Sequence, residues 1–360
     1  MKKRILPLAL AGCLLLSGCR AMLERSYSAA APHVDHPVTA EDPSVLRVEN
    51  YRELVSAVLY LVSEGEEEGT IQLHNYDGEE EGDLSAACLE VATQDPLGAY
   101  AVDYIKHELS RVVSYYQATL AIHYRRSPGQ IAGIVSVNGD RAIRDQLQVA
   151  LEDFSTEVVL RVPYFFGDEE TVKALLREAY YAHPALALPE TEVSLYPDSG
   201  RERIVEITMT YPGDAETLRE KREELSQRVD RLLPEEEHPS GRAAARLALE
   251  RLWDGGTDLE ETGADGVYDP DGGSTAYDAL VKARADSEGM ALGYALLCRR
   301  LGLTCTVQAG KLEDEARFWN VVELPSGEKV CVDPSLGREW DPSAHSEEEF
   351  FSLGYFLPET

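Results

Sequence analysis

Residues 51–212 repeat one pattern of helical and extended segments, and this repeat limits the possible folds more than any other feature of the chain. In the first copy we expect helices near 50–63 and 84–94, strands at 70–76, 99–109 and 115–124, and a turn at 95–100. In the second copy we expect helices near 141–153 and 169–183, and strands at 156–165, 191–197 and 203–211. Each copy is therefore predicted to be a helix–β-α-β-β unit, an α+β sheet with its helices on one face.

Residues 1–19 have the layout of a bacterial export signal. A basic start (1–4) precedes an apolar run (5–16) that is too short to span a bilayer in the mature protein. The Leu-Ser-Gly-Cys sequence at 16–19 resembles a bacterial lipobox, in which the cysteine is lipidated and becomes the new N-terminus. The resemblance implies attachment to membrane lipid through Cys19, by acyl chains such as palmitate, on the extracytoplasmic face of the cell membrane. The alternative is an ordinary signal peptide with an incidental Cys19.

The chain is strongly acidic, with 65 Asp and Glu against 34 Lys and Arg and a formal charge of −31. This charge repels nucleic acid, anionic lipid and anionic wall polymers, so no nucleic-acid partner is predicted. It favours solubility and cationic partners, and it carries no information about the fold.

The cysteines give no sign of a metal centre. Beyond Cys13 and Cys19 they are Cys88, Cys298, Cys305 and Cys331, and none belongs to a CxxC pair. Asp269 and Asp271 lie in a Gly/Asp-rich loop at 254–275, but their spacing does not fit an EF-hand. No metal and no cofactor is therefore predicted. Export permits a disulfide among the remaining cysteines, yet their spacing selects no partners, and buried free thiols are the other possibility.

Residues 276–333 have the pattern of a buried helix followed by three strands. Met290, Tyr294, Leu297 and Leu301 recur at spacings of four, three and four, which gives one buried helical face. Gly302 is placed to terminate this helix. Strands are then expected at 303–309, 317–324 and 329–333, the last two joined by a turn at 325–327.

Short blocks in this region match the pattern of a known family, in order and at fitting distances. The blocks are Thr275-Ala276-Tyr277, Leu280-Val281, Glu288-Gly289, Ala291, Leu301-Gly302-Leu303, Cys305, Val307, Gly310, Trp319-Asn320, Val322 and Val332-Asp333. They fall within about residues 240–345 and resemble a bacterial transglutaminase-like domain of the papain-like thiol superfamily. The resemblance implies a papain-like α+β fold for this part of the chain.

Two of the three catalytic positions implied by the resemblance are substituted. Ser287 stands at the position of the family's nucleophilic cysteine and Arg317 at that of its histidine, whereas Asp333 keeps the acid. A serine hydroxyl needs a general base to become nucleophilic, and an arginine side chain does not deprotonate in proteins. The sequence has no histidine between His238 and His345, and His345 could act only if the fold brought it round to the site.

The turn at 325–327 places Arg317 roughly opposite Asp333, so we expect a cross-strand ion pair where the family has His and Asp. The favoured function is a membrane-anchored surface lipoprotein whose degenerate, inactive transglutaminase-like domain binds or scaffolds at the cell envelope. Its expected cleft is lined by Ser287, Arg317, Trp319 and Asp333, and its expected partner is an envelope protein or wall peptide. A purely structural reading stays open: Ser287 as a helix cap, Trp319 in the core, and Arg317–Asp333 as a strand pair.

Two further functions remain open. An active acyltransferase or peptidase could use Ser287 with a lysine as base, and the candidate bases are Lys282, Lys311 and Lys329. Asp286 and Glu288 flank the serine, but both are expected to stay ionised at a helix N-terminus and to be weak bases. Alternatively, the N-terminal repeats carry the function as an interaction module.

The predicted organisation has five parts. They are a lipoprotein signal peptide (1–18), a flexible tether (19–45), a first α+β unit (46–139), a second α+β unit with a charged bridging helix (140–235) and a transglutaminase-like domain (236–360).

Overall fold

The computed structural model describes residues 45–233, 239–255, 267–312, 314–336, 346–353, 355 and 356. The predicted signal peptide, the predicted lipidation site Cys19, nearly all of the predicted tether and His345 lie outside the described residues. The predicted α+β class is confirmed, because helices and mixed sheets alternate along the chain. The chain divides into two compact units, residues 1–132 and 133–360.

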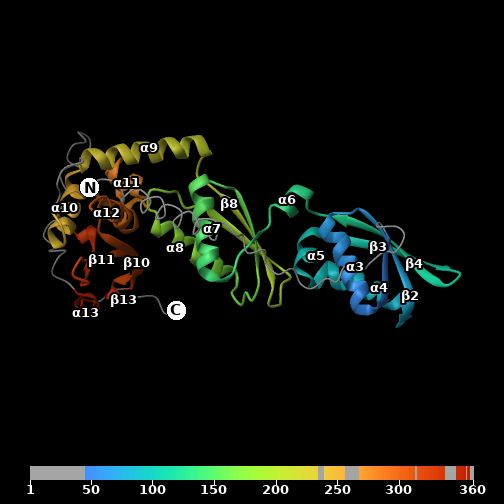
Figure 1. Ribbon diagram of the computed structural model, residues 1–360. Coiled ribbons are helices and arrows are strands. Elements are labelled where there is room, and N and C mark those ends of the chain that lie inside the picture. Colours follow the sequence, from blue (N-terminus) through green and yellow to red (C-terminus); the bar gives the residue numbers. More distant parts are fainter. Residues whose placement is uncertain are drawn as a thin grey trace, which may run out of the picture. The chain divides into compact units, whose positions relative to one another are not determined.

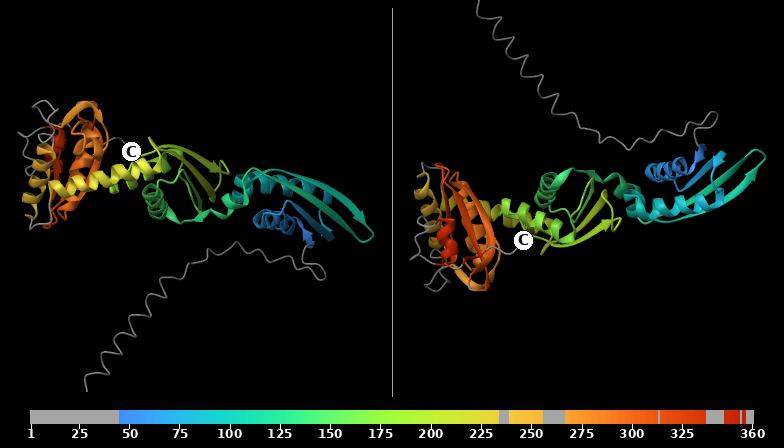
Figure 2. Two further views of the ribbon diagram at one scale, coloured as in Figure 1. Left: turned by 90° about the horizontal axis from the view of Figure 1, so that it is seen from above. Right: turned by 90° about the horizontal axis from the view of Figure 1, so that it is seen from below.

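The first unit is a four-stranded sheet with helices packed on it (Figure 1). Its elements are β1 (Val45–Asn50), α3 (Tyr51–Glu64), β2 (Glu68–Asp77), α4 (Glu80–Gln94), α5 (Pro96–Ala101), β3 (Val102–Val112), β4 (Tyr115–Tyr124) and α6 (Pro128–Ala132). The strand order is β1-β2-β4-β3, with β1 parallel to β2 and the other pairs antiparallel. The β3–β4 hairpin is long and projects from this unit (Figure 2), and Val113 in its turn is fully exposed.

The second unit begins with a sheet of the same design. Its first elements are β5 (Val135–Ser136), α7 (Gly139–Asp153), β6 (Glu157–Val162), α8 (Glu169–Ala182), β7 (Glu190–Tyr196) and β8 (Arg203–Thr210). The order β5-β6-β8-β7, with β5 parallel to β6, matches the first sheet strand for strand. The predicted repeat is therefore confirmed.

Two local features of the repeats were predicted incorrectly. Each copy opens with an additional short strand, so the unit is β-α-β-α-β-β. The two residues of β5 are too few to give a periodic pattern, and the six residues of β1 had no prediction although they alternate in burial. The segment predicted as a turn at 95–100 is largely the helix α5. Asp95 caps it by accepting the N–H groups of Leu97 and Gly98, and Pro96 fits the first helical turn, where its missing N–H has no cost.

The rest of the second unit holds a third sheet around a buried helix. The elements are α9 (Ala215–Leu232), α10 (Arg242–Asp254), β9 (Tyr268–Gly273), α11 (Ala276–Leu280), α12 (Ser287–Arg300), β10 (Thr304–Leu312), β11 (Glu315–Glu323), β12 (Lys329–Val332), a 3-10 turn (Pro334–Leu336), α13 (Glu347–Ser352) and β13 (Tyr355–Phe356). The antiparallel order is β12-β11-β10-β13, and α12 packs on β10 and β11. Gly302 follows α12 with φ of 75°, so its predicted role as helix terminator is confirmed.

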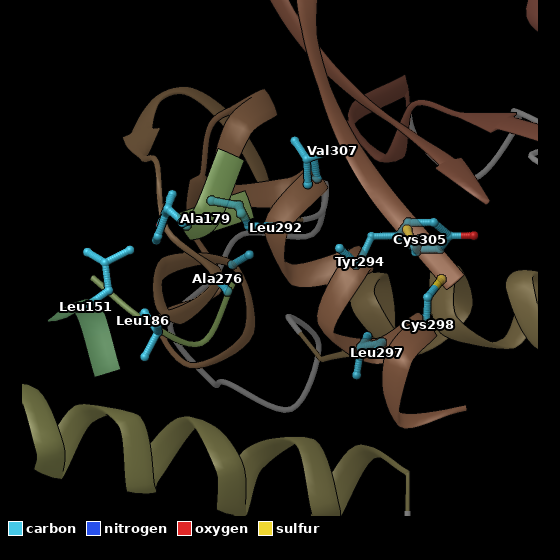
Figure 3. Packing of buried hydrophobic residues seen from close by; sticks show 14 of the residues in the cluster. Leu151, Ala179, Leu186, Ala276, Leu292, Tyr294, Leu297, Cys298, Cys305 and Val307 are labelled. Carbon is cyan, nitrogen blue, oxygen red and sulfur yellow. The ribbon is translucent and has the colours of Figure 1, made fainter. Parts of the chain in front are cut away.

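One hydrophobic core runs through the second unit. The buried cluster extends from Val137 to Val332 and takes in residues of α7, α8, α9, α10 and α12. Ala179 and Leu186 of the second repeat lie among Ala276, Leu292 and Leu297 of the C-terminal part (Figure 3). Residues on both sides of the domain boundary that the sequence predicted at 235/236 therefore share one core.

The segment 254–275 was predicted to be a loop, but Tyr268–Gly273 forms the strand β9, which bridges to Ala285. Asp269 accepts hydrogen bonds from Arg284 Nε at 2.5 Å and from the Asp271 N–H at 2.9 Å. Among the described residues, no group of three or more His, Cys, Asp or Glu side chains could hold a metal ion. The described helices include none that is long and apolar enough to cross a membrane.

Candidate functional site

Ser287 is the first residue of α12, and it does not cap the helix. The N-cap is Asp286, whose Oδ1 accepts the Gly289 N–H at 2.9 Å. The prediction that Ser287 is a cap is therefore wrong by one position. The carboxylate of Asp286 satisfies the free N–H group and also complements the positive end of the helix dipole.

Ser287 is largely buried at the start of the helix. The residue is 8% exposed, and the segment leading to it is held to β9, because the Asp286 N–H donates to the Gly273 carbonyl at 3.1 Å. In the part of the chain that the structure describes, no group makes a hydrogen bond to Ser287 Oγ. A base that accepts this proton directly would have to lie within hydrogen-bond distance of the hydroxyl.

Arg317 and Asp333 form the ion pair predicted from the hairpin. Arg317 Nε donates to Asp333 Oδ2 at 2.8 Å, so this prediction is confirmed. The pairing of Asn320 with Val332 in β11 and β12 sets Asp333 level with Trp319. Arg317 is therefore a diagonal neighbour of Asp333 on the same face of the sheet, which is within reach of a long side chain.

The carboxylate of Asp333 has donors on both of its oxygens. Tyr355 donates its hydroxyl to Oδ2 at 2.8 Å, beside Arg317. The backbone N–H of Ser335 donates to Oδ1 at 2.9 Å, and the Ser335 hydroxyl donates to the same oxygen. Asp333 has no exposed surface. A buried charge is tolerated only when it is paired and hydrogen-bonded, and Asp333 meets both conditions.

Arg317 is held in place by a second contact. Its Nη1 donates to the hydroxyl of Tyr268 at 3.1 Å, and its guanidinium carbon lies 5.4 Å from the centre of the Tyr268 ring. Burial acts to lower the pKa of Arg317, but the Asp333 carboxylate outweighs burial, so the pKa lies above its ordinary value. Arg317 is therefore permanently cationic and cannot act as a base.

Trp319 is 2% exposed and packs edge-on against Tyr355, with ring centres 5.4 Å apart. It forms a small buried cluster with Tyr355 and Cys331. Trp319 is therefore a core residue, which is one of the two roles that the sequence analysis left open for it. Cys88, Cys298, Cys305 and Cys331 are all free and buried.

Three residues of this network were missed by the sequence analysis: Tyr268, Ser335 and Tyr355. Ser335 carried a weak signal, because a serine two residues after a buried carboxylate can turn back to bond it. Tyr268 and Tyr355 gave no usable signal, because each lies in a segment predicted to be a loop or left without a prediction.

Glu288, the residue after Ser287, contacts helix α8. Glu288 accepts a hydrogen bond from the Tyr181 hydroxyl of α8 at 2.9 Å. Burial raises the pKa of Glu288, and the hydrogen bond from Tyr181 only partly offsets this effect. The sequence analysis considered the helix dipole but not burial against α8, which acts on the pKa of Glu288 in the opposite direction.

The three candidate lysine bases occupy exposed positions. Lys282 Nζ lies 2.8 Å from Asp278 Oδ1. Lys311 and Lys329 are exposed on β10 and β12. Within the described residues, none of them hydrogen-bonds to Ser287.

Comparisons with known proteins do not assign this chain to a family. No protein-family model and no curated protein matches the sequence. A solved structure described as "Crystal structure of a TGase" is similar at a TM-score of 0.26 and 13% identity, covering 66% of this chain and 67% of that one.

Proposed function

We propose that residues 236–360 form a transglutaminase-like domain without catalytic chemistry, in a lipoprotein that binds or scaffolds at the cell envelope. The observation that carries this proposal is the replacement of a proton-transferring pair by Arg317 and Asp333. In the described residues, no group hydrogen-bonds to the hydroxyl at the nucleophile position. Arg317 cannot act as the missing base, because a guanidinium keeps its proton at neutral pH.

Burial favours scaffolding over capture of a ligand in the former cleft. Ser287, Trp319 and Asp333 are 8%, 2% and 0% exposed. They offer almost no surface to a wall peptide, and Tyr268 and Tyr355 already fill the polar contacts of Arg317 and Asp333. An envelope protein that docks on the outer surface of the domain is the partner we favour.

Turnover assays test the absence of chemistry. Wild-type protein and Ser287→Ala are each offered a labelled amine with glutamine-containing casein, and separately a fluorogenic peptide. We expect both proteins to stay at the background rate. Turnover by the wild type that disappears in Ser287→Ala would establish the alternative, an acyltransferase or peptidase that uses Ser287.

A converse variant tests the resemblance. Ser287→Cys combined with Arg317→His restores both family residues beside Asp333. Activity gained by the double variant, and by neither single variant, would show that the scaffold of a transglutaminase-like site persists. Lipid attachment is tested separately by metabolic labelling with radioactive palmitate, which we expect to label the wild type and to leave Cys19→Ser unlabelled.

A further inference from the structure

We propose that a cavity in the second unit binds a small carboxylate with an apolar body. The cavity has a volume of about 260 Å³ and lies between α9, α11 and the loop that follows α8. This volume is just below the roughly 300–1,000 Å³ of sites for drug-sized ligands, so the ligand must be smaller. The proposal does not depend on whether Ser287 is active.

Helix α9 supplies one wall of this cavity with an unusual face. Leu218, Lys221, Arg222 and Leu225 fall at positions i, i+3, i+4 and i+7, so they share one side of the helix. Leu218 and Leu225 are buried, which shows that this side faces inward. Between them, Lys221 is exposed and Arg222 is half-buried, so each holds its charge at the water-facing edge of this apolar stripe, where a negative charge can meet it.

No such charge meets them within the described residues: no carboxylate lies within 4 Å of the charged nitrogens of Lys221 or Arg222. Arg222 donates to the Glu152 backbone carbonyl at 3.0 Å, and its guanidinium carbon lies 5.2 Å from the centre of the Phe154 ring. Lys221 Nζ lies 6.0 Å from the centre of the Tyr277 ring. In a chain with 65 acidic and 34 basic residues, two neighbouring cations without a carboxylate indicate a site for an external anion.

The opposite wall adds a third cation and a single carboxylate. Lys282 Nζ lies 5.7 Å from the centre of the Tyr277 ring, so two lysines flank this ring. The lining carboxylate, Asp278, is already engaged by Lys282 and by the backbone and hydroxyl of Thr275. The whole lining of the cavity therefore holds three cations, Lys221, Arg222 and Lys282, against one carboxylate, and that carboxylate already has hydrogen-bond partners.

The remainder of the cavity is apolar. Its lining includes Phe154, Pro184, Ala185, Leu186, Ala187 and Pro212. Leu186, labelled in Figure 3, belongs to the buried cluster that also contains Ala276 of α11. An aliphatic or phenyl group would lose its water-exposed surface here, while its carboxylate meets Lys221 and Arg222. The structure thus assigns an amphipathic monocarboxylate rather than a polar anion such as inorganic phosphate.

Calorimetric titration of the full-length protein tests this site. The probes are 3-phenylpropionate, hexanoate and the uncharged isostere 3-phenylpropanamide. We expect at least one carboxylate to bind in 1:1 stoichiometry, and the amide to bind about tenfold more weakly or worse, equivalent to losing one charge contact of about 1.4 kcal/mol. Added salt should weaken the carboxylate and leave the amide unchanged.

Matched variants locate the binding. Lys221→Met with Arg222→Met keeps the apolar stems and removes both charges, so carboxylate binding should fall at least tenfold. Arg219→Met alters an exposed cation of the same helix and should leave binding unchanged. Equal binding by the Lys221/Arg222 double variant and the wild type would overturn the proposal, as would the absence of binding by both carboxylates at millimolar concentration.

Discussion

Arg317 Nε lies 2.8 Å from Asp333 Oδ2, at a place where the carboxylate has no exposed surface. A histidine in the place of Arg317 could hand a proton on, but the guanidinium holds its protons permanently. The guanidinium of Arg317 therefore supplies the counter-charge of the buried carboxylate, and it cannot itself act as a base. This relationship bears on how Ser287, at the position that the resemblance assigns to the nucleophile, is interpreted.

Removal of the Arg317 side chain should destabilise the folded protein. Arg317→Ala leaves Asp333 buried without its counter-charge, and we expect the free energy of unfolding to fall by about 3–5 kcal/mol. Urea unfolding followed by tryptophan fluorescence measures this loss, since all three tryptophans lie in the C-terminal third of the chain.

A surface pair provides the control for this measurement. Arg242 pairs with Glu328, and both side chains are about half exposed, so Arg242→Ala should cost less than about 1 kcal/mol. Similar losses for Arg317→Ala and Arg242→Ala would contradict the assignment of a buried, stabilising pair.

The start of α12 gives a second prediction, which separates the cap from its neighbour. Asp286→Ala removes the N-cap acceptor and should cost about 1 kcal/mol. Ser287→Ala removes a hydroxyl with no described partner and should change the free energy of unfolding by less than about 0.5 kcal/mol. Chemical denaturation of the two variants checks the order, and a larger loss for Ser287→Ala would reveal an important contact at that hydroxyl.

The contribution of Glu288 to the free energy of unfolding is predicted to depend on pH. Its pKa in the folded protein is raised above the ordinary value of 4.5 by burial, so the folded state binds more protons than the unfolded state between those two values. The free energy of unfolding contributed by this group therefore falls as pH rises through that window. In Glu288→Gln this group no longer titrates, so the variant does not lose this contribution. The free energy of unfolding of Glu288→Gln minus that of the wild type should therefore rise across the window and then stay constant.

Tyr181→Phe sharpens this test. The Tyr181 hydroxyl acts to lower the pKa of Glu288, so its removal should raise that pKa further and extend the window to higher pH. Unfolding curves measured at intervals between pH 4 and pH 8 give both differences. A relative stability of Glu288→Gln that declines with rising pH would show that Glu288 is not destabilised in its charged form.

The continuous core predicts how the chain can be divided. Residues 45–132 enclose their own core and should give a cooperative thermal transition as an isolated fragment. A fragment of residues 133–360 should do the same. Cutting at 235/236 exposes apolar faces of α8, α9 and α12, so residues 236–360 alone should aggregate or melt without cooperativity. A cooperative transition in that shorter fragment would contradict the shared core.

Much of the architecture could be predicted because it depends on local pattern. The alternation of apolar residues predicted the main strands, and the turn at 325–327 was enough to bring Arg317 to Asp333. The elements that the sequence did not predict form only because of residues far away in the chain. The two-residue β5 is a strand only because β6 lies beside it, and Tyr355 reaches Asp333 only because β13 adds to the edge of β10. The shared core was hidden because Pro234 to Pro239 reads as a linker, whereas the faces of α9 that join the two parts are ordinary apolar stripes.

The most direct test of the central claim is the reactivity of the Ser287 hydroxyl itself. A fluorophosphonate probe acylates serines that a neighbouring base has activated, and intact-mass analysis with peptide mapping shows which residue carries it. We predict no modification of Ser287 in the wild-type protein over hours at neutral pH. Stoichiometric labelling of Ser287, absent in Ser287→Ala, would show that a proton acceptor does serve this hydroxyl and would contradict the account.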